Sequence, residues 1–144
     1  MEIYTIGFTK KSAEQFFGLL RGAGIERLVD IRLNNSSQLA GFTKSRDLEF
    51  FLREVLGASY VHEPLLAPSE RIFKAYKAGG TWAEYEVAYL SLLREREVER
   101  SLKREDFETR SVLLCSEPTA ERCHRRLAAE YLNTAWGDIR RIDL

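Results

Sequence analysis

One short stretch collects most of the side chains in this chain that could do chemistry. Residues 112–126, VLLCSEPTAERCHRR, pass from an apolar strand pattern through a polar turn into a helix pattern. The stretch holds both cysteines of the chain, a histidine, two glutamates and three arginines. Open α/β proteins place their active sites where a strand end delivers side chains beside a helix N-terminus. We therefore predict a functional site here, although the stretch does not specify the reaction.

Four side chains are the candidates for catalysis. Asp30 and Glu117 are candidate general bases, and His124 is a candidate acid or orienting group because a free imidazole titrates near neutrality. Cys115 is a candidate nucleophile, since amides at a helix N-terminus would stabilise its thiolate. Two alternatives stay open. Cys115 could be an inert core cysteine, and His124 could be a packing histidine bonded to backbone.

Four further side chains are candidates for binding an anion: Arg32, Lys44, His62 and Arg125. Arg32 follows a strand beside Asp30, so it suits carboxylate or phosphate recognition, or a structural ion pair with Asp30 or Glu117. We expect the helix after the polar turn to have Thr119 as its N-cap. On that helical wheel Cys123 and His124 face the sheet, and Arg125 faces solvent.

The two cysteines allow several interpretations. Two cysteines make no disulfide framework, so we expect thiols; a pair formed within this short loop would be a redox device. A phosphatase or sulfurtransferase loop has arginine six residues after its cysteine, but that position is Glu121 here. Zinc could in principle bind Cys115, Glu117, Cys123 and His124. The spacing fits no common zinc module, and neighbouring helical residues point about 100° apart, so we predict no metal.

The rest of the chain alternates strand and helix patterns that would position these residues. Strand patterns cover residues 2–8, 27–32, 59–62, 112–114 and 138–144. Ser12 and Gln15 fit a capping box at the start of one helix, and Ser45 can cap a second helix over 46–56. A third helix pattern begins at about Trp82 and a fourth follows Thr119, with a helical turn at 72–78. This alternation predicts one three-layer α/β domain over residues 1–144, with a largely parallel sheet of about five strands flanked by helices. The carboxyl ends of its strands should converge on one crevice. The polar connection at 33–44 is either a functional loop or a surface loop.

Composition narrows the class of protein. Lys+Arg and Asp+Glu are each 22, so no strong overall field favours nucleic acid. No apolar run is long enough for a membrane span, and the N-terminal MEIYTIGF is a strand pattern and not a signal peptide. We therefore expect a cytoplasmic protein without a membrane partner. The sequence identifies no cofactor and does not fix the oligomeric state.

Several segments together resemble domain-of-unknown-function family 488: YTIGFT, LVDIR, GFTK, YVHEP and LLCSEPTAERCHRRLAAEYL. The resemblance covers nearly the whole chain in the right order, and its most specific part is the C-x-E…C-H-R motif. The family pattern maps onto Gly7, Asp30, Arg32, Lys44, His62, Cys115, Glu117, Cys123, His124 and Arg125. This chain departs from the pattern at residues 63–67, EPLLA, and in the Asn- and Ser-rich loop after Arg32. The resemblance implies a site and names no activity.

Our leading hypothesis is a small enzyme acting on a phosphate-bearing or other anionic substrate, such as a nucleotide or a nucleic acid. The main alternative is a noncatalytic module that binds a nucleotide or nucleic-acid segment in the same crevice. A metal or thiol redox site is the second alternative. Catalysis would require Asp30 or Glu117 within hydrogen-bond reach of His124 or a cysteine, whereas binding requires only converging donors.

Overall fold

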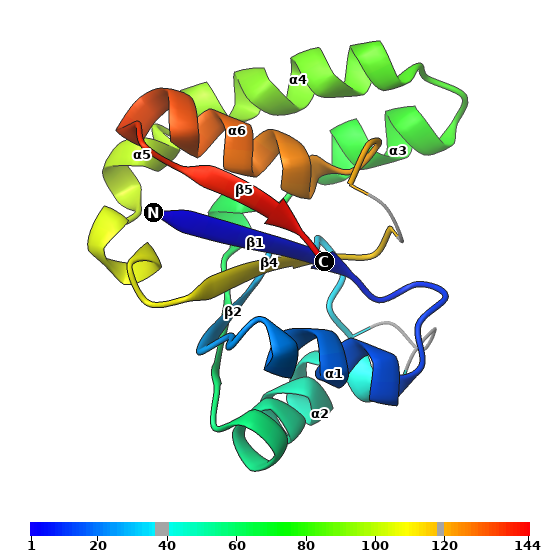
Figure 1. The fold of residues 1–144 in the computed structure, drawn as a ribbon. Coiled ribbons are helices and arrows are strands. Elements are labelled where there is room, and N and C mark those ends of the chain that lie inside the picture. The colour runs from blue at the N-terminus through cyan, green and yellow to red at the C-terminus, as the bar shows by residue number, and fades with distance from the viewer. Residues whose placement is uncertain (37–40, 118–119) are drawn as a thin grey trace.

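The protein is built on one five-stranded parallel sheet. A computed structural model describes residues 1–36, 41–117 and 120–144. The strands are β1 (Glu2–Gly7), β2 (Arg27–Asp30), β3 (Ser59–His62), β4 (Ser111–Cys115) and β5 (Arg140–Asp143). They lie in the order β3-β2-β4-β1-β5, and the pairs between neighbours are all parallel (Figure 1). The predicted α/β class and parallel sheet are confirmed, and the structure adds the strand order.

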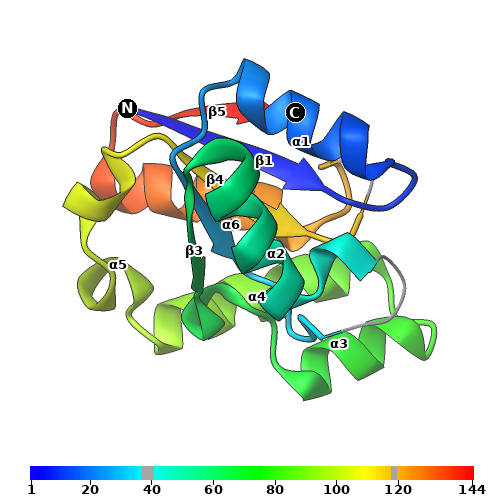
Figure 2. The ribbon, with the colours of Figure 1, turned by 90° about the horizontal axis from the view of Figure 1, so that it is seen from below.

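Helices cover both faces of this sheet. The helices are α1 (Ala13–Gly22), α2 (Ser45–Phe51), α3 (Glu70–Lys77), α4 (Trp82–Glu95), α5 (Val98–Ser101) and α6 (His124–Trp136). A short π-helix, η2 (Leu52–Leu56), continues α2. Short 3-10 helices occur at η1 (Gly41–Thr43), η3 (Pro64–Leu66) and η4 (Arg104–Phe107). One face carries α1 and α2, and the other carries α3 to α6 (Figures 1 and 2). Of the helices in the described ranges, none is long and apolar enough to cross a membrane.

The three inner strands, β1, β2 and β4, are buried on both sides, as parallel strands between two helical layers usually are, whereas the edge strands β3 and β5 are partly exposed. Side chains alternate across a strand, so Ile3 and Leu113 join the core beneath α3 to α6, while Ile6 and Leu114 join the core beneath α1 and α2. All four are fully buried. This burial fixes the register of β1 against β4, because a slip by one residue would exchange the two faces.

The helix starts show which local patterns in the sequence are reliable. Ser12 forms the expected capping box with Gln15, because each side chain bonds the other's backbone N–H, at 3.1 and 2.9 Å. Ser45 was expected to cap the next helix, but it is the first residue of α2, and Lys44 occupies the N-cap without a side-chain bond. The expected loop at 33–44 lies partly outside the described residues. Its C-terminal part contains η1.

Candidate functional site

A pocket of about 220 Å³ opens at the carboxyl ends of β2 and β4. Its first wall is the polar segment after β4, with Cys115, Ser116, Glu117, Arg122, Cys123 and His124. Facing it are aromatic and basic side chains from α3 and α4: Phe73, Tyr76, Lys77, Trp82 and Tyr85. The remaining lining residues are Phe8, Arg32, Leu33, Asn34 and Pro68. The pocket therefore lies where convergence of parallel strand ends places a site.

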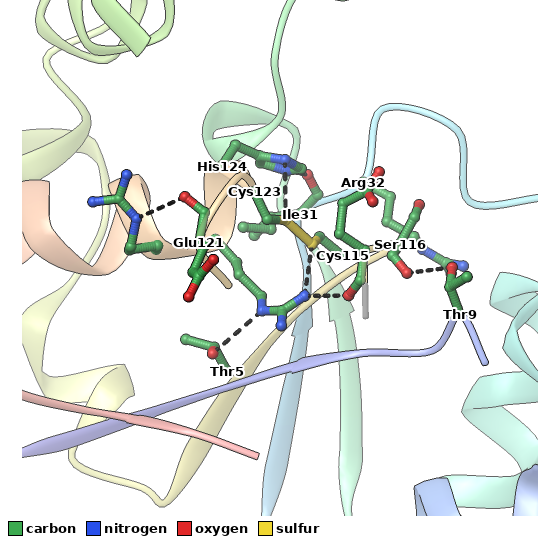
Figure 3. The surroundings of a disulfide bond; sticks show 12 residues. Thr5, Thr9, Ile31, Arg32, Cys115, Ser116, Glu121, Cys123 and His124 are labelled. Atoms are coloured by element: carbon green, nitrogen blue, oxygen red, sulfur yellow. Dashed lines mark hydrogen bonds between the residues drawn. A yellow bond between two sulfur atoms is a disulfide. The ribbon is translucent and has the colours of Figure 1, made fainter. Parts of the chain in front are cut away.

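Gly7 allows the end of β1 to lie directly against the segment after β4. A Cβ atom at this position would lie 1.5 Å from the Glu117 carbonyl oxygen and 2.6 Å from Arg125 Nη1. Two residues later, the backbone N–H and the hydroxyl of Thr9 both donate to the Ser116 carbonyl, at 3.1 and 2.5 Å (Figure 3). These contacts fix the backbone of Ser116 and Glu117 at the pocket wall.

Cys115 and Cys123 form a disulfide at the inner end of the pocket (Figure 3). The expectation that they are two thiols is therefore wrong for this structure. Cys115 is the last residue of β4, and Cys123 immediately precedes α6, so the disulfide joins the end of the strand to the start of the helix. Both residues are buried. The pair links two residues that are eight positions apart in the sequence.

The last long helix begins later than the sequence pattern suggested. Its N-cap is Cys123, with an extended backbone at φ −138° and ψ 141°, and Thr119 lies outside the described residues. The buried residues of α6 are Arg125, Leu127, Ala128, Ala129 and Leu132. Arg125 was predicted to face solvent but is only 1% exposed, because the predicted face was centred on Cys123 and His124, and Cys123 lies outside the helix.

Arg125 joins three strands of the sheet to α6. Its Nη1 donates to the Glu117 carbonyl at 2.6 Å and to Cys115 Sγ at 3.1 Å. Its Nε donates to the Thr5 hydroxyl at 3.3 Å, and that hydroxyl donates to the Asp143 carboxylate at 2.6 Å. Desolvation by burial lowers the pKa of Arg125 to about 10, which leaves it a cation at neutral pH. These bonds direct the guanidinium toward the strand ends and the disulfide.

Asp30 and Arg32 form a buried ion pair in which Arg32 lines the pocket and Asp30 lies behind it. Arg32 Nε and Nη2 donate to the two oxygens of Asp30, both at 2.8 Å. The Tyr60 hydroxyl donates to Asp30 Oδ2 at 2.6 Å, and Arg32 Nη2 also donates to the Thr43 carbonyl at 2.6 Å. Burial raises the pKa of Tyr60 first, and its bond to Asp30 raises it further. This is the structural ion pair that the sequence offered as one interpretation of Arg32.

His124 is held in one tautomer by the backbone. Its Nε2 lies 2.7 Å from the Ile31 carbonyl oxygen, which can only accept, so Nε2 carries the proton (Figure 3). Nδ1 then holds the free lone pair, and it lies 4.0 Å from Cys123 Sγ. The ring of Tyr89 packs against the imidazole edge at 5.5 Å. Desolvation lowers the pKa of His124 to about 4, so the imidazole is neutral at physiological pH.

Three of these side chains form a donor set that could hold a metal. The ligand atoms of Cys115, Cys123 and His124 lie within 4.8 Å of one another. The sequence argued against such a set because neighbouring helical residues diverge. Cys123 is not helical, however, and its extended backbone lets its side chain converge with that of His124.

The structure gathers some of the predicted site residues and separates others. The pocket lining includes Cys115, Glu117, His124 and Arg32. Asp30 and Arg125 lie behind the pocket and are bonded to its lining residues. Lys44 and His62 are not among the lining residues. Lys44 precedes α2, and His62 ends β3 with its Nε2 3.2 Å from the Arg32 carbonyl oxygen. The aromatic wall was not predicted as part of the site. The signal in the sequence that could have found it is two pairs of aromatic residues, each three apart, at 73 and 76 and at 82 and 85.

Fold and site together define a parallel α/β protein with a strand-end pocket that borders a Cys–Cys–His cluster. The family model described as "Domain of unknown function DUF488" matches residues 12–132, and the chain belongs to this family. The resemblance seen in the sequence is confirmed at that level. Neither a curated protein nor a solved structure matches the chain.

Proposed function

We propose that the chain is a small enzyme that acts on an anionic substrate with a planar ring, of the nucleotide class, in the strand-end pocket. The observation that supports this is the composition of the pocket walls. One wall is aromatic, the rim carries exposed cations, and the opposite wall carries Glu117 beside the Cys–Cys–His cluster. Apolar pockets with a few convergent polar groups are typical of small-molecule sites.

The aromatic wall suits a flat ring. Trp82 and Tyr85 stack with their centroids 5.1 Å apart and an angle of 19° between ring planes. Tyr76 packs against Tyr85 at 5.1 Å and against Trp82 at 5.9 Å, which holds the three rings as one rigid group. Trp82 and Tyr76 remain partly exposed. A base stacked on such a surface gains about 1–3 kcal/mol.

The charges that line the pocket favour an anion. Lys77 of α3 and Arg122 of the polar segment are both exposed and both line the pocket. Arg32 adds a third cation whose charge is partly balanced by Asp30. Positive side chains around a cleft raise the local concentration of anions and bind phosphate directly. Lys77 and Arg122 thereby take the role that the sequence assigned to Lys44 and Arg125.

Glu117 is the candidate general base at this pocket. Its backbone carbonyl is held by Arg125 at 2.6 Å, while its side chain is exposed and lines the pocket. An anchored backbone with a free carboxylate suits proton abstraction from a bound substrate or water. Asp30 suits this role less, because its two oxygens already accept bonds from Arg32 and Tyr60.

Fluorescence of Trp82 tests the proposal. In a Trp136→Phe background Trp82 is the only tryptophan, since the chain has two. Adenosine monophosphate should quench it with saturation, and inorganic phosphate should compete without quenching. Arg122→Met should weaken nucleotide binding about tenfold through loss of one phosphate contact. The matched control is Arg100→Met, which removes an exposed arginine that pairs with Glu97 outside the pocket and should leave nucleotide binding unchanged.

Product analysis then separates an enzyme from a binding module. Nucleotides should be converted by the wild-type chain, and Glu117→Gln should retain binding but lose turnover. If the chain binds mononucleotides but converts none of them, the noncatalytic alternative is favoured. If Trp82 fluorescence is unchanged by millimolar adenosine mono-, di- and triphosphate, the proposal is overturned.

A further inference from the structure

We infer that, once the disulfide is reduced, Cys115, Cys123 and His124 bind one soft divalent metal ion of the zinc class at the inner end of the pocket. Two thiolates and a neutral imidazole are a donor set that such ions prefer. The metal site follows from these three residues alone. Only its use in catalysis rests on the proposed function.

The distances fit a metal of this size. Zinc binds thiolate sulfur at about 2.3 Å and imidazole nitrogen at about 2.0–2.1 Å, which puts tetrahedral donors roughly 3.5–4 Å apart. Cys123 Sγ and His124 Nδ1 are already 4.0 Å apart. The two sulfurs are bonded in the structure, and after reduction they can separate by rotation about their own side-chain bonds.

The surroundings of His124 prepare it as a ligand. Metal-binding histidines usually donate their second ring N–H to a carbonyl or carboxylate, which fixes the tautomer and aims the free nitrogen. His124 makes this bond from Nε2 to the Ile31 carbonyl at 2.7 Å. The lone pair on Nδ1 is therefore directed toward Cys123 Sγ, in the direction where the ion would lie.

Arg125 gives Cys115 the partner that a ligating thiolate needs. Its Nη1 donates to Cys115 Sγ at 3.1 Å from a side chain that is 1% exposed. In the described part of the chain, the hydrogen bonds of this guanidinium all go to uncharged acceptors: Thr5 Oγ1, Cys115 Sγ and the Glu117 carbonyl. A thiolate at Cys115 would supply the buried cation with an anionic partner, which stabilises the reduced, metal-binding form.

Binding is then controlled by the oxidation state of the pair. A dithiol reductant transfers two electrons and two protons, the Cys115–Cys123 bond breaks, and the reductant becomes a disulfide. The metal ion displaces the two thiol protons and forms two metal–sulfur bonds and one metal–nitrogen bond. The disulfide form offers only His124 and should bind no metal. Because all three ligands line the pocket, a fourth position faces it and can take water or a substrate oxygen.

Cobalt titration tests the site without measuring activity. Reduced protein, freed of reductant under anaerobic conditions, should bind one equivalent of Co²⁺ with thiolate charge-transfer and visible ligand-field bands, and Zn²⁺ should remove both. Protein with zero free thiols by thiol titration should show neither band. Cys115→Ser, Cys123→Ser and His124→Gln should each weaken binding about 100-fold or more. The chain supplies its own control, since it has two histidines and His62→Gln should bind like the wild type.

Two results would overturn the site. One is reduced, folded wild-type protein that shows no cobalt bands at stoichiometric metal. The other is wild-type affinity in folded Cys123→Ser or His124→Gln protein. If His124→Gln does not fold, the wild-type protein still tests the site: the intensity of its charge-transfer band must correspond to two thiolate ligands on the cobalt ion. The nucleotide titration on oxidised protein is separate, so failure of the metal site and failure of the proposed function are distinguishable.

Discussion

Replacing Gly7 by alanine should destabilise the protein more than any conservative change elsewhere at the site. Gly7 ends β1, and its missing side chain leaves room for the Glu117 carbonyl and the Arg125 guanidinium. A Cβ would lie 1.5 Å from that carbonyl oxygen, where real Cβ contacts keep at least 3.0 Å, so the backbone must retreat by roughly 1.5 Å. Such a movement breaks the 2.6 Å bond from Arg125 to the carbonyl.

The expected loss follows from these two effects. A hydrogen bond to a charged group contributes about 1.5–3 kcal/mol, and overpacking costs about 1–3 kcal/mol. Gly7→Ala should therefore lower the free energy of unfolding by about 2.5–6 kcal/mol, which is a large part of the stability of an ordinary domain. Arg125→Met should remove the same bond, so the double variant should lose less than the two single losses together.

Urea unfolding of matched glycine variants measures this. Gly18 lies in α1, and a Cβ there would meet nothing within 4 Å. Gly18→Ala should stabilise the protein by about 0.5–1 kcal/mol, because alanine is the better helix former. If the free energy of unfolding of Gly7→Ala lies within 1 kcal/mol of the wild-type value, β1 does not contact the Glu117 backbone as described, and the reasoning fails.

Three further substitutions test the interior. Arg32→Met leaves buried Asp30 without its cation and should cost about 3–5 kcal/mol in urea unfolding; a loss below 1 kcal/mol would contradict the ion pair. Tyr60→Phe removes the 2.6 Å donor to Asp30 and should cost about 1–2 kcal/mol in the same assay. Arg96→Met removes one guanidinium nitrogen that bonds three carbonyls in 64–67, at 3.2, 2.8 and 2.6 Å, so hydrogen exchange should speed up around η3 and leave the β1 amides unchanged.

The sheet and its helices could be predicted because their determinants are local. Buried parallel strands appear as short apolar runs, and Ser12 with Gln15 marks a helix start through side chains that bond the backbone. The site was located for a related reason. Parallel strand ends converge whatever their order, so Cys115, Glu117 and Arg32 could be assigned to one crevice before the order β3-β2-β4-β1-β5 was known.

The orientation of Arg125 could not be predicted because it depends on where α6 begins. Cys123 is the N-cap but makes no side-chain capping bond, so the sequence does not mark the start. The predicted face was centred on Cys123 and His124, and because Cys123 lies outside α6, the buried face includes Arg125 instead. The same unmarked start concealed the convergence of Cys123 and His124. The aromatic wall was missed because Tyr85 and Tyr89 have the spacing of ordinary core residues. Only the path of α3 and α4 over the strand ends brings the aromatic side chains of these two helices to the pocket.

The position of β1 near the middle of the sheet determines when the chain can fold. Ile3 pairs with Ser111, and Glu2 pairs with Arg140, so β1 is synthesised well before either of the strands that it pairs with. Until β4 has been synthesised, β2 and β3 can pair only with each other. Pairing between segments so distant in sequence slows folding, and β1 must wait with its apolar residues uncovered.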